Sequence, residues 1–254
     1  MTLFADKPAA LAILRSMLIE AAGSYINVAA IHNDTLYRKL LAAEKSAQRR
    51  LRVFLEPTKV FAGEPTAGEL AALPTGALWV EESGYDYEPD RWNTDQWGYL
   101  VLRNIFVSKV DSVQFVYPAP ASALFTIPPS WIRLDKKAGH IRFVPAGTAM
   151  SGATFSAFIL SAMYGGRTVP QMIQVRYTAG LADAAEDYPD LIDLIYKMAI
   201  VLAINDSFPA QSGSISSDGL SQSNSLDMSK WQEVIDASLE NMRDSMHGVR
   251  CMVL

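Results

Sequence analysis

The chain has 254 residues, half of them hydrophobic, and a formal net charge of −5, which suffices for a substantial buried core. Its longest basic cluster is Arg49-Arg50-Leu51-Arg52, and no apolar run approaches the roughly 20 residues of a transmembrane helix. The single cysteine, Cys251, excludes an internal disulfide. We therefore expect no membrane partner, no sequence-specific DNA binding and assembly in a reducing cytoplasm.

Two helices are predicted before residue 57. The first runs from about Pro8 to Gly23, with Asp6 as its cap. The second begins after Asn33 or Asp34, both good capping residues, and ends at Pro57. The charged residues along the second helix, Glu44 among them, are expected at the surface. Its buried face is expected to consist of Leu36, Leu40, Ala43, Ala47 and Leu51.

Residues 57–180 replace helical periodicity with alternation and with recurrent prolines and glycines. Val113, Phe115 and Tyr117 alternate with Gln114 and Val116 ahead of Pro118, which is typical of a strand. The segments 131–134 and 141–144 flank a short polar turn ending at Gly139, which predicts a hairpin. A second hairpin is predicted between 155–163 and 172–177. Because helix-length crossovers are missing, we expect a mostly antiparallel sheet or small barrel.

The chain returns to helix after Gly180. A strand over 173–177 ends at this glycine, which can adopt backbone angles closed to other residues, and Pro189 fits the first turn of the next helix. The helix that follows Pro189 has a wide apolar stripe, so we expect it to be largely buried. Residues 207–227 are rich in serine, glycine and asparagine, so we expect them to be mobile unless a partner orders them. The last helix is expected to begin near Ser229, in a capping box with Gln232, and to end at Gly248.

No residue stands out as catalytic, and no cofactor or metal is expected. His32, His140 and His247 lack the spacing of metal ligands, and neither a hydrolase elbow nor a phosphate-binding loop occurs. One segment, 81–97, combines carboxylates with aromatic residues. Such a segment is typical of a protein interface or a plain loop. Two other roles of the segment stay open. Its carboxylates could act as a catalytic pair on a sugar, or the alternating acids at positions 86, 88 and 90 could bind calcium.

The end of the β-rich region also carries a recognisable order of motifs. Tyr177-Thr178-Ala179-Gly180, an acidic loop and Pro189-Asp190-Leu191 leading into an apolar helix resemble the closing segment of the head–tail connector (adaptor) proteins of tailed bacteriophages. The predicted helix over 34–51 is similar to the capped, alanine-rich helix of that family, and 127–141 is similar to its hairpin. The segment 64–97 looks like an insertion, and the helix before residue 30 is extra.

Together these features predict an α+β fold. N-terminal helices (1–56) and C-terminal helices with their serine-rich loop and tail (181–254) form a helical bundle, which the resemblance identifies as the ring body. A large antiparallel β region (57–180) is inserted between them. The resemblance implies a non-enzymatic virion protein of the neck that forms a ring, commonly of twelve copies. Its partners are then the portal protein, a stopper, tail-completion or tail protein, and further copies of itself. Passing DNA in the channel is contacted only non-specifically.

The last helix and the apolar tail are the expected ring and portal interface. Its candidate residues are Trp231, Met242, Met246, Val249, Cys251, Met252, Val253 and Leu254. Three alternatives stay open: another tail component such as a stopper or tail-completion protein, a glycan- or receptor-binding virion module built on the aromatic β region, and an enzyme that acts on cell-wall sugar through the acids of 81–90.

Overall fold

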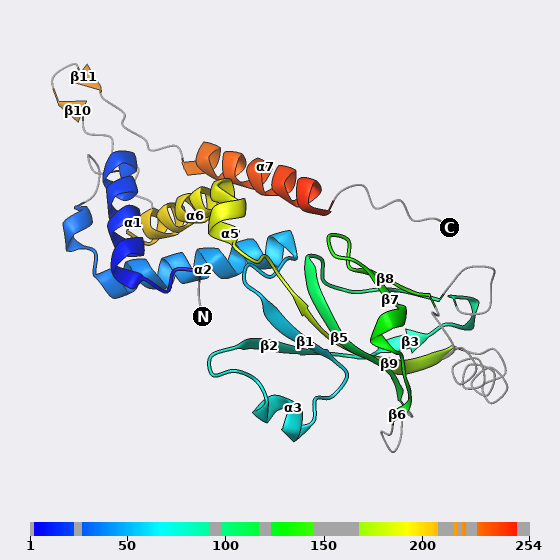
Figure 1. The fold of residues 1–254 in the computed structure, drawn as a ribbon. Helices are drawn as coiled ribbons and strands as arrows, with labels where there is room; N and C mark the ends of the chain where they lie inside the picture. Colours follow the sequence, from blue (N-terminus) through cyan, green and yellow to red (C-terminus); the bar gives the residue numbers. More distant parts are fainter. Residues whose placement is uncertain are drawn as a thin grey trace. The chain divides into compact units, whose positions relative to one another are not determined.

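A computed structural model of the chain describes residues 3–22, 27–91, 98–116, 123–144, 168–207, 216–217, 220–221 and 228–247. The chain divides into two compact units. The first, here called the β unit, comprises residues 53–182, and the second, the helical unit, comprises 2–52 together with 183–254. The predicted α+β class is confirmed, because helices lie at both ends of the chain and the sheets lie between them (Figure 1).

The helical unit is built around one central helix. Its elements are α1 (Lys7–Ala22), η1 (Val28–Ala30), α2 (Asn33–Leu51), α5 (Ala184–Asp187), α6 (Pro189–Ser207) and α7 (Met228–His247), with a short ladder of β10 (Ser216–Ser217) and β11 (Leu220–Ser221). Helix α6 contacts α1, α2, α5 and α7. It is apolar around most of its circumference, with an exposed ion pair between Asp193 and Lys197. A helix of this kind is stable only when its neighbours surround it.

Helix α2 follows its predicted pattern with three corrections. All five residues of the predicted apolar face are buried. The cap is His32, whose Nδ1 accepts a hydrogen bond from Asp34 N, because the side-chain oxygen of Asn33 accepts from Arg15 instead. The helix ends at Leu51, ahead of Pro57, with Arg52 in the left-handed conformation (φ 56°). Glu44, expected at the surface, is only 2% exposed.

Helix α1 begins where Asp6 was expected to cap it, and Asp6 Oδ1 accepts a hydrogen bond from Ala9 N at 3.1 Å. Helix α7 begins at Met228, so Ser229 lies inside the helix and is not its cap, as had been expected. Gly248 and most of the serine-rich segment 207–227 lie outside the described residues.

The described residues of the β unit form two sheets. Its elements are β1 (Thr58–Ala62), α3 (Ala67–Ala71), β2 (Leu78–Glu82), β3 (Tyr85–Tyr87), η2 (Pro89–Arg91), β4 (Tyr99–Val101), β5 (Val107–Val116), β6 (Ala123–Thr126), η3 (Pro129–Trp131), β7 (Ile132–Asp135), β8 (His140–Phe143) and β9 (Val169–Ala179). The main sheet has the order β2-β1-β9-β5-β6, with β3 also paired to β9, and the second has the order β4-β8-β7.

The main sheet is mostly antiparallel, as predicted, but β1 and β2 are parallel. Parallel neighbours need a long crossover. The connection between β1 and β2 supplies it through the short helix α3, which sequence reasoning did not anticipate.

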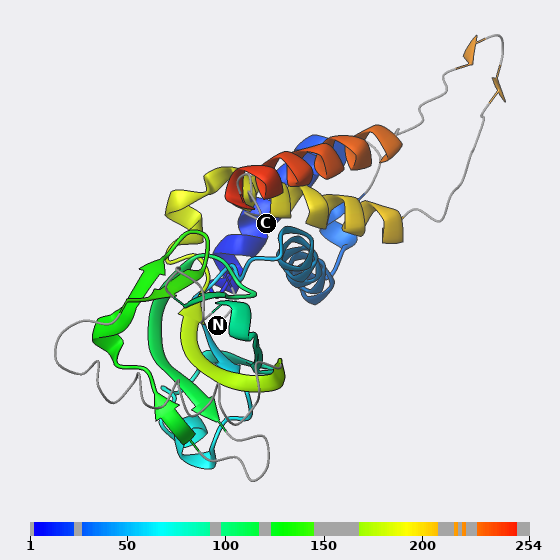
Figure 2. The same ribbon diagram turned by 90° about the vertical axis from the view of Figure 1, so that its right-hand side faces the viewer.

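Strands β5 and β9 are long and strongly curved (Figure 2), and β9 lies at the centre of the main sheet. One face of this sheet packs with the second sheet into a single apolar core that includes Val60, Val113, Tyr177, Ile141 and Phe143. The predicted hairpin is confirmed as β7 and β8. Tyr117 and the strand expected over 155–163 lie outside the described residues.

Candidate functional site

The motif at the end of β9 is shaped by the steric demands on Gly180. Its φ is +123°, and a Cβ added there would lie 2.3 Å from the carbonyl oxygen of Glu56. Gly180 N donates to Phe106 O, and Leu181 N donates to Phe54 O, each at 3.0 Å. Only glycine fits this position, which is where the strand was predicted to leave the sheet. Pro189 then begins α6, as predicted.

Tyr177 in the same motif is fully buried and carries a polar contact into the core. Its hydroxyl accepts from Asn104 Nδ2 at 2.8 Å and donates to Glu82 Oε2 at 3.3 Å, with the Tyr85 hydroxyl 3.5 Å away. Burial, followed by the proximity of Tyr85 and Glu82, raises the pKa of Tyr177 far above its ordinary value. The hydroxyl therefore stays protonated and cross-links β9 with β2 and the loop before β5.

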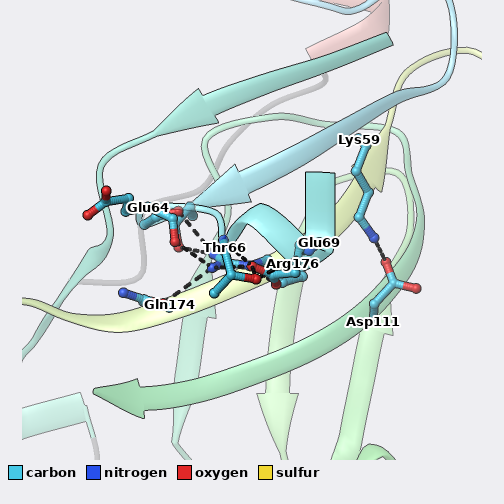
Figure 3. Close-up of polar contacts among 9 residues, drawn as sticks. Lys59, Glu64, Thr66, Glu69, Asp111, Gln174 and Arg176 are labelled. Carbon is cyan, nitrogen blue, oxygen red and sulfur yellow. Dashed lines mark hydrogen bonds and ion pairs between the residues drawn. The ribbon is translucent and has the colours of Figure 1, made fainter. Parts of the chain in front are cut away.

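Arg176 points to the opposite face of the sheet and organises the loop between β1 and α3 (Figure 3). It is 8% exposed. Its Nη1 donates to the carbonyls of Ala62 and Gly63 at 3.1 Å each, and its Nη2 donates to that of Glu64 at 2.9 Å. Its Nε donates to Glu69 Oε1 at 2.7 Å. The planar guanidinium thus satisfies its donors with one loop, which is an anchoring role.

Glu69 joins this anchor to the start of α3. Thr66 N donates to Glu69 Oε2 at 2.8 Å, and Glu69 N donates to Thr66 Oγ1 at 3.2 Å, which is a complete capping box. Burial alone would raise the pKa of Glu69. The hydrogen bonds from Arg176 and Thr66 and the Arg176 charge outweigh burial, so this pKa lies below its ordinary value of 4.5. Glu69 is therefore ionised near neutral pH.

A second charged cluster lies on the same face of the sheet. Asp111 on β5 forms an ion pair with Lys59 on β1 (Figure 3). It forms a second one with Lys109, whose Nζ lies 2.8 Å from Asp111 Oδ1. Burial would raise the pKa of Asp111, but hydrogen bonds from the two lysines lower it below its ordinary value. The carboxylate is flanked by cations and is suited to holding strands, not to accepting a proton in catalysis.

The described acids of the segment 81–97 do not converge on one point. Glu82 accepts from Asn104 at 2.6 Å, and Asp86 accepts from Gln171 N at 2.8 Å. Glu88 forms an ion pair with Arg91 at 2.7 Å. Across the described parts of the chain, no cluster of three or more His, Cys, Asp or Glu residues is arranged to hold a metal ion.

The described aromatic residues of this segment belong to the core of the β unit, which is contrary to the interpretation of the segment as a protein interface. Tyr85 and Tyr87 alternate with exposed Asp86 and are buried in the core of the β unit. Tyr87 packs edge-on against Phe115, with ring centroids 6.1 Å apart. They are therefore not available to a partner. Trp92 and Trp97 lie outside the described residues.

The predicted interface residues on α7 differ in exposure. Trp231 is 40% exposed, Met242 is half-buried, and Met246 is buried with Ile235 and Leu239. The tail candidates Val249, Cys251, Met252, Val253 and Leu254 lie outside the described residues.

Sequence reasoning missed several exposed apolar side chains. They are Ile13 and Ile19 on α1, Val234 on α7, Trp79 on β2 and Leu124 on β6. For α1 a signal was present, because apolar residues occur around the whole helix and not on one stripe alone. Trp79 and Leu124 were missed because the sequence pattern does not show which strands lie at the edges of the sheet.

No protein-family model and no curated protein matches this sequence. A chain in a structure of the neck of an empty GTA particle, computed with C6 symmetry, is similar to it at a TM-score of 0.45 and 14% identity. The alignment covers 96% of this chain and 91% of that chain. Similarity at this level does not establish a common fold. Within the described residues, no helix is both long enough and apolar enough to cross a bilayer.

Proposed function

We propose that this chain is a structural, non-enzymatic protein of a tailed-bacteriophage neck, a head–tail connector that forms a ring under the portal protein. The observation that carries the proposal is the junction at Gly180. There the motif Tyr177 to Gly180 ends β9, sterically requires a glycine, and leads through Pro189 into the apolar helix α6. This is the order of elements in which the sequence resembles the closing segment of connector proteins.

The surface of the helical unit supports an assembly role. Ile13 and Ile19 on α1 are 49% and 57% exposed, and Val234 on α7 is 66% exposed. These exposed apolar side chains are available for burial against a partner. In the proposed ring these faces contact neighbouring copies or the portal, and a stopper or tail-completion protein binds on the other side.

The net charge supports a passive DNA channel. A chain with a net charge of −5, repeated around a ring, repels the phosphates of the genome and lets it slide. Contact with DNA is then transient and independent of sequence. Glu69, Glu82 and Asp86 serve as hydrogen-bond acceptors within the fold, and the proposal assigns them a structural role.

The test is electron microscopy of particles made when this gene carries an early stop codon, with the wild-type gene supplied in trans as the control. The proposal expects filled or leaking heads beside complete, free tails. Heads joined to tails that have lost their DNA would instead indicate a stopper. Intact virions that fail to adsorb would refute the proposal and favour a receptor- or glycan-binding module.

A further inference from the structure

We propose that neighbouring copies of this chain join edge to edge through the β unit, with β2 of one copy pairing to β6 of the next. The ring of the proposed function gives this contact its biological setting. Strands β2 and β6 are the two ends of the main sheet, and among the described residues no further strand pairs with either of them. Edge strands present unpaired N–H and C=O groups that can pair with another chain.

The directions of the two edges are complementary. Strand β2 is parallel to β1, and each following step, β1 to β9, β9 to β5 and β5 to β6, is antiparallel. Strands β2 and β6 therefore run in opposite directions within one sheet. Two copies placed side by side in the same orientation bring β2 against β6 as antiparallel neighbours. Because the two edges differ, the contact repeats from copy to copy, as a ring requires.

The main-chain groups at the centre of both edges face outward. Gly63 N donates to Glu82 O at 2.7 Å, so Glu82 turns its carbonyl toward β1, and the alternation turns the main chain of Trp79 outward. On β6, Ile127 N donates to Val113 O at 2.9 Å, which directs the main chain of Thr126 outward. Leu124 lies at a bulge and has no partner residue on β5.

The side chains at the two edges match as well. Trp79 is 47% exposed and Leu124 is 40% exposed. Trp79 lies opposite Lys59 on the face that carries Arg176, and its ring contacts Phe61 edge-on at 6.1 Å. Leu124 is adjacent to Phe125, which packs against the core, and its exposed side chain lies at the bulge of this edge strand. Placed opposite each other in an antiparallel pair, the two exposed side chains of Trp79 and Leu124 form an apolar contact across the junction.

The two edges carry few of the charges and prolines that usually protect an edge against pairing, although β6 is short and has a bulge at Leu124. Natural edge strands commonly carry charged residues or prolines that block association. Strand β6 (Ala123–Thr126) has neither, and β2 has no charge before Glu81. A second copy of this chain supplies the matching edge, the matching direction and the matching apolar residue.

Disulfide trapping tests the pairing. In a Cys251→Ser background, Trp79→Cys and Leu124→Cys are introduced together and the purified chain is oxidised near its solubility limit. Directly opposed residues on paired strands have Cβ atoms about 5 Å apart, within reach of a disulfide after small adjustment. We expect a ladder of dimers, trimers and larger species on a non-reducing gel. The matched control combines Trp79→Cys with Ser108→Cys, an exposed position on the interior strand β5, and gives no ladder.

Each single-cysteine variant is a further control. Covalent dimers from Trp79→Cys or Leu124→Cys alone would mean that like edges meet, which overturns the proposal. Absence of a ladder from the double variant, with an unchanged melting temperature, overturns it too. A ladder together with normal virions from the stop-codon strain would separate the two ideas, because the edge contact would stand while the neck role fails. If the stop-codon strain gives detached heads and tails but the double variant gives no ladder, the neck role would stand while the edge contact fails.

Discussion

Replacing Gly180 with alanine is expected to destabilise the β unit more than the same replacement at Gly76, a glycine of positive φ whose surroundings are open. The added Cβ would lie 2.3 Å from Glu56 O and 2.9 Å from the carbonyl carbon of Glu56. A φ of +123° also disfavours every side chain, at a cost of about 1–3 kcal/mol. To relieve the clash, the chain must separate β9 from the segment at Phe54, where Leu181 N donates to Phe54 O.

The two effects combine. Loss of the hydrogen bonds from Gly180 N to Phe106 O and from Leu181 N to Phe54 O adds about 1 kcal/mol for each bond. We therefore expect a loss of about 4 kcal/mol, and a fall in melting temperature of roughly 8–16 °C for a protein of this size. Near-ultraviolet circular dichroism reports the transition of the β unit through its buried tyrosines.

The matched control is Gly76→Ala. Gly76 also has a positive φ, +81°, but an added Cβ meets nothing within 4 Å. This variant should show only the backbone cost, about 1 kcal/mol. Equal melting temperatures for Gly180→Ala and Gly76→Ala would show that the close approach to Glu56 O does not limit position 180, and the steric argument would be wrong.

Further predictions concern the Arg176 anchor, the helical core and the tail. Arg176→Lys cannot reproduce the fork of donors to Ala62, Gly63 and Glu64, so limited proteolysis should cut the loop 63–71 faster than in the wild type, whereas Lys136→Arg should change nothing. Because the pKa of Glu69 is lowered in the fold, its stabilising contribution is present above pH 4.5 and is lost as the pH falls through the lowered value. The difference in denaturation midpoint between wild type and Glu69→Gln should therefore shrink in acid; a constant difference would contradict the ion pair. Leu40→Ala should cost about 3 kcal/mol in chemical denaturation, whereas exposed Ile19→Ala should cost less than about 0.5 kcal/mol. Deleting residues 249–254 should leave the melting temperature unchanged and weaken pull-down by the portal ring; undiminished binding would exclude the tail from that interface.

Much of the helical packing could be predicted because its signals are local. The apolar face of α2 is periodic in the sequence, and every predicted member is buried. Glu44 departs from this pattern because α2 contacts α1, α6 and α7, so more than one stripe of the helix is covered. The cap at His32 was missed because Asn33, the better capping residue by type, is taken by Arg15 from another helix.

The polar anchors of the β unit could not be predicted because their partners are distant in sequence. Arg176 and Glu69 are separated by 107 positions, and in the sequence Arg176 is only one polar member of an alternating strand. The hydroxyl of Tyr177 likewise meets Asn104 and Glu82, which no local pattern links to it. Gly180 was the exception in part, since its positive φ is a property of its own backbone, whereas the close approach of Glu56 O could not be seen in the sequence.

The entry and exit of the β unit lie side by side, because Leu181 N donates to Phe54 O at 3.0 Å and Thr58 on β1 is the register partner of Ala179 on β9. A unit whose two ends are one hydrogen bond apart can be cut out of a gene, or exchanged for another, without stretching the chain that receives it. Residues 53–182 thus have the geometry of an insert: we expect that a short linker from Arg52 to Asp183 can replace them and leave the helices of the helical unit in place.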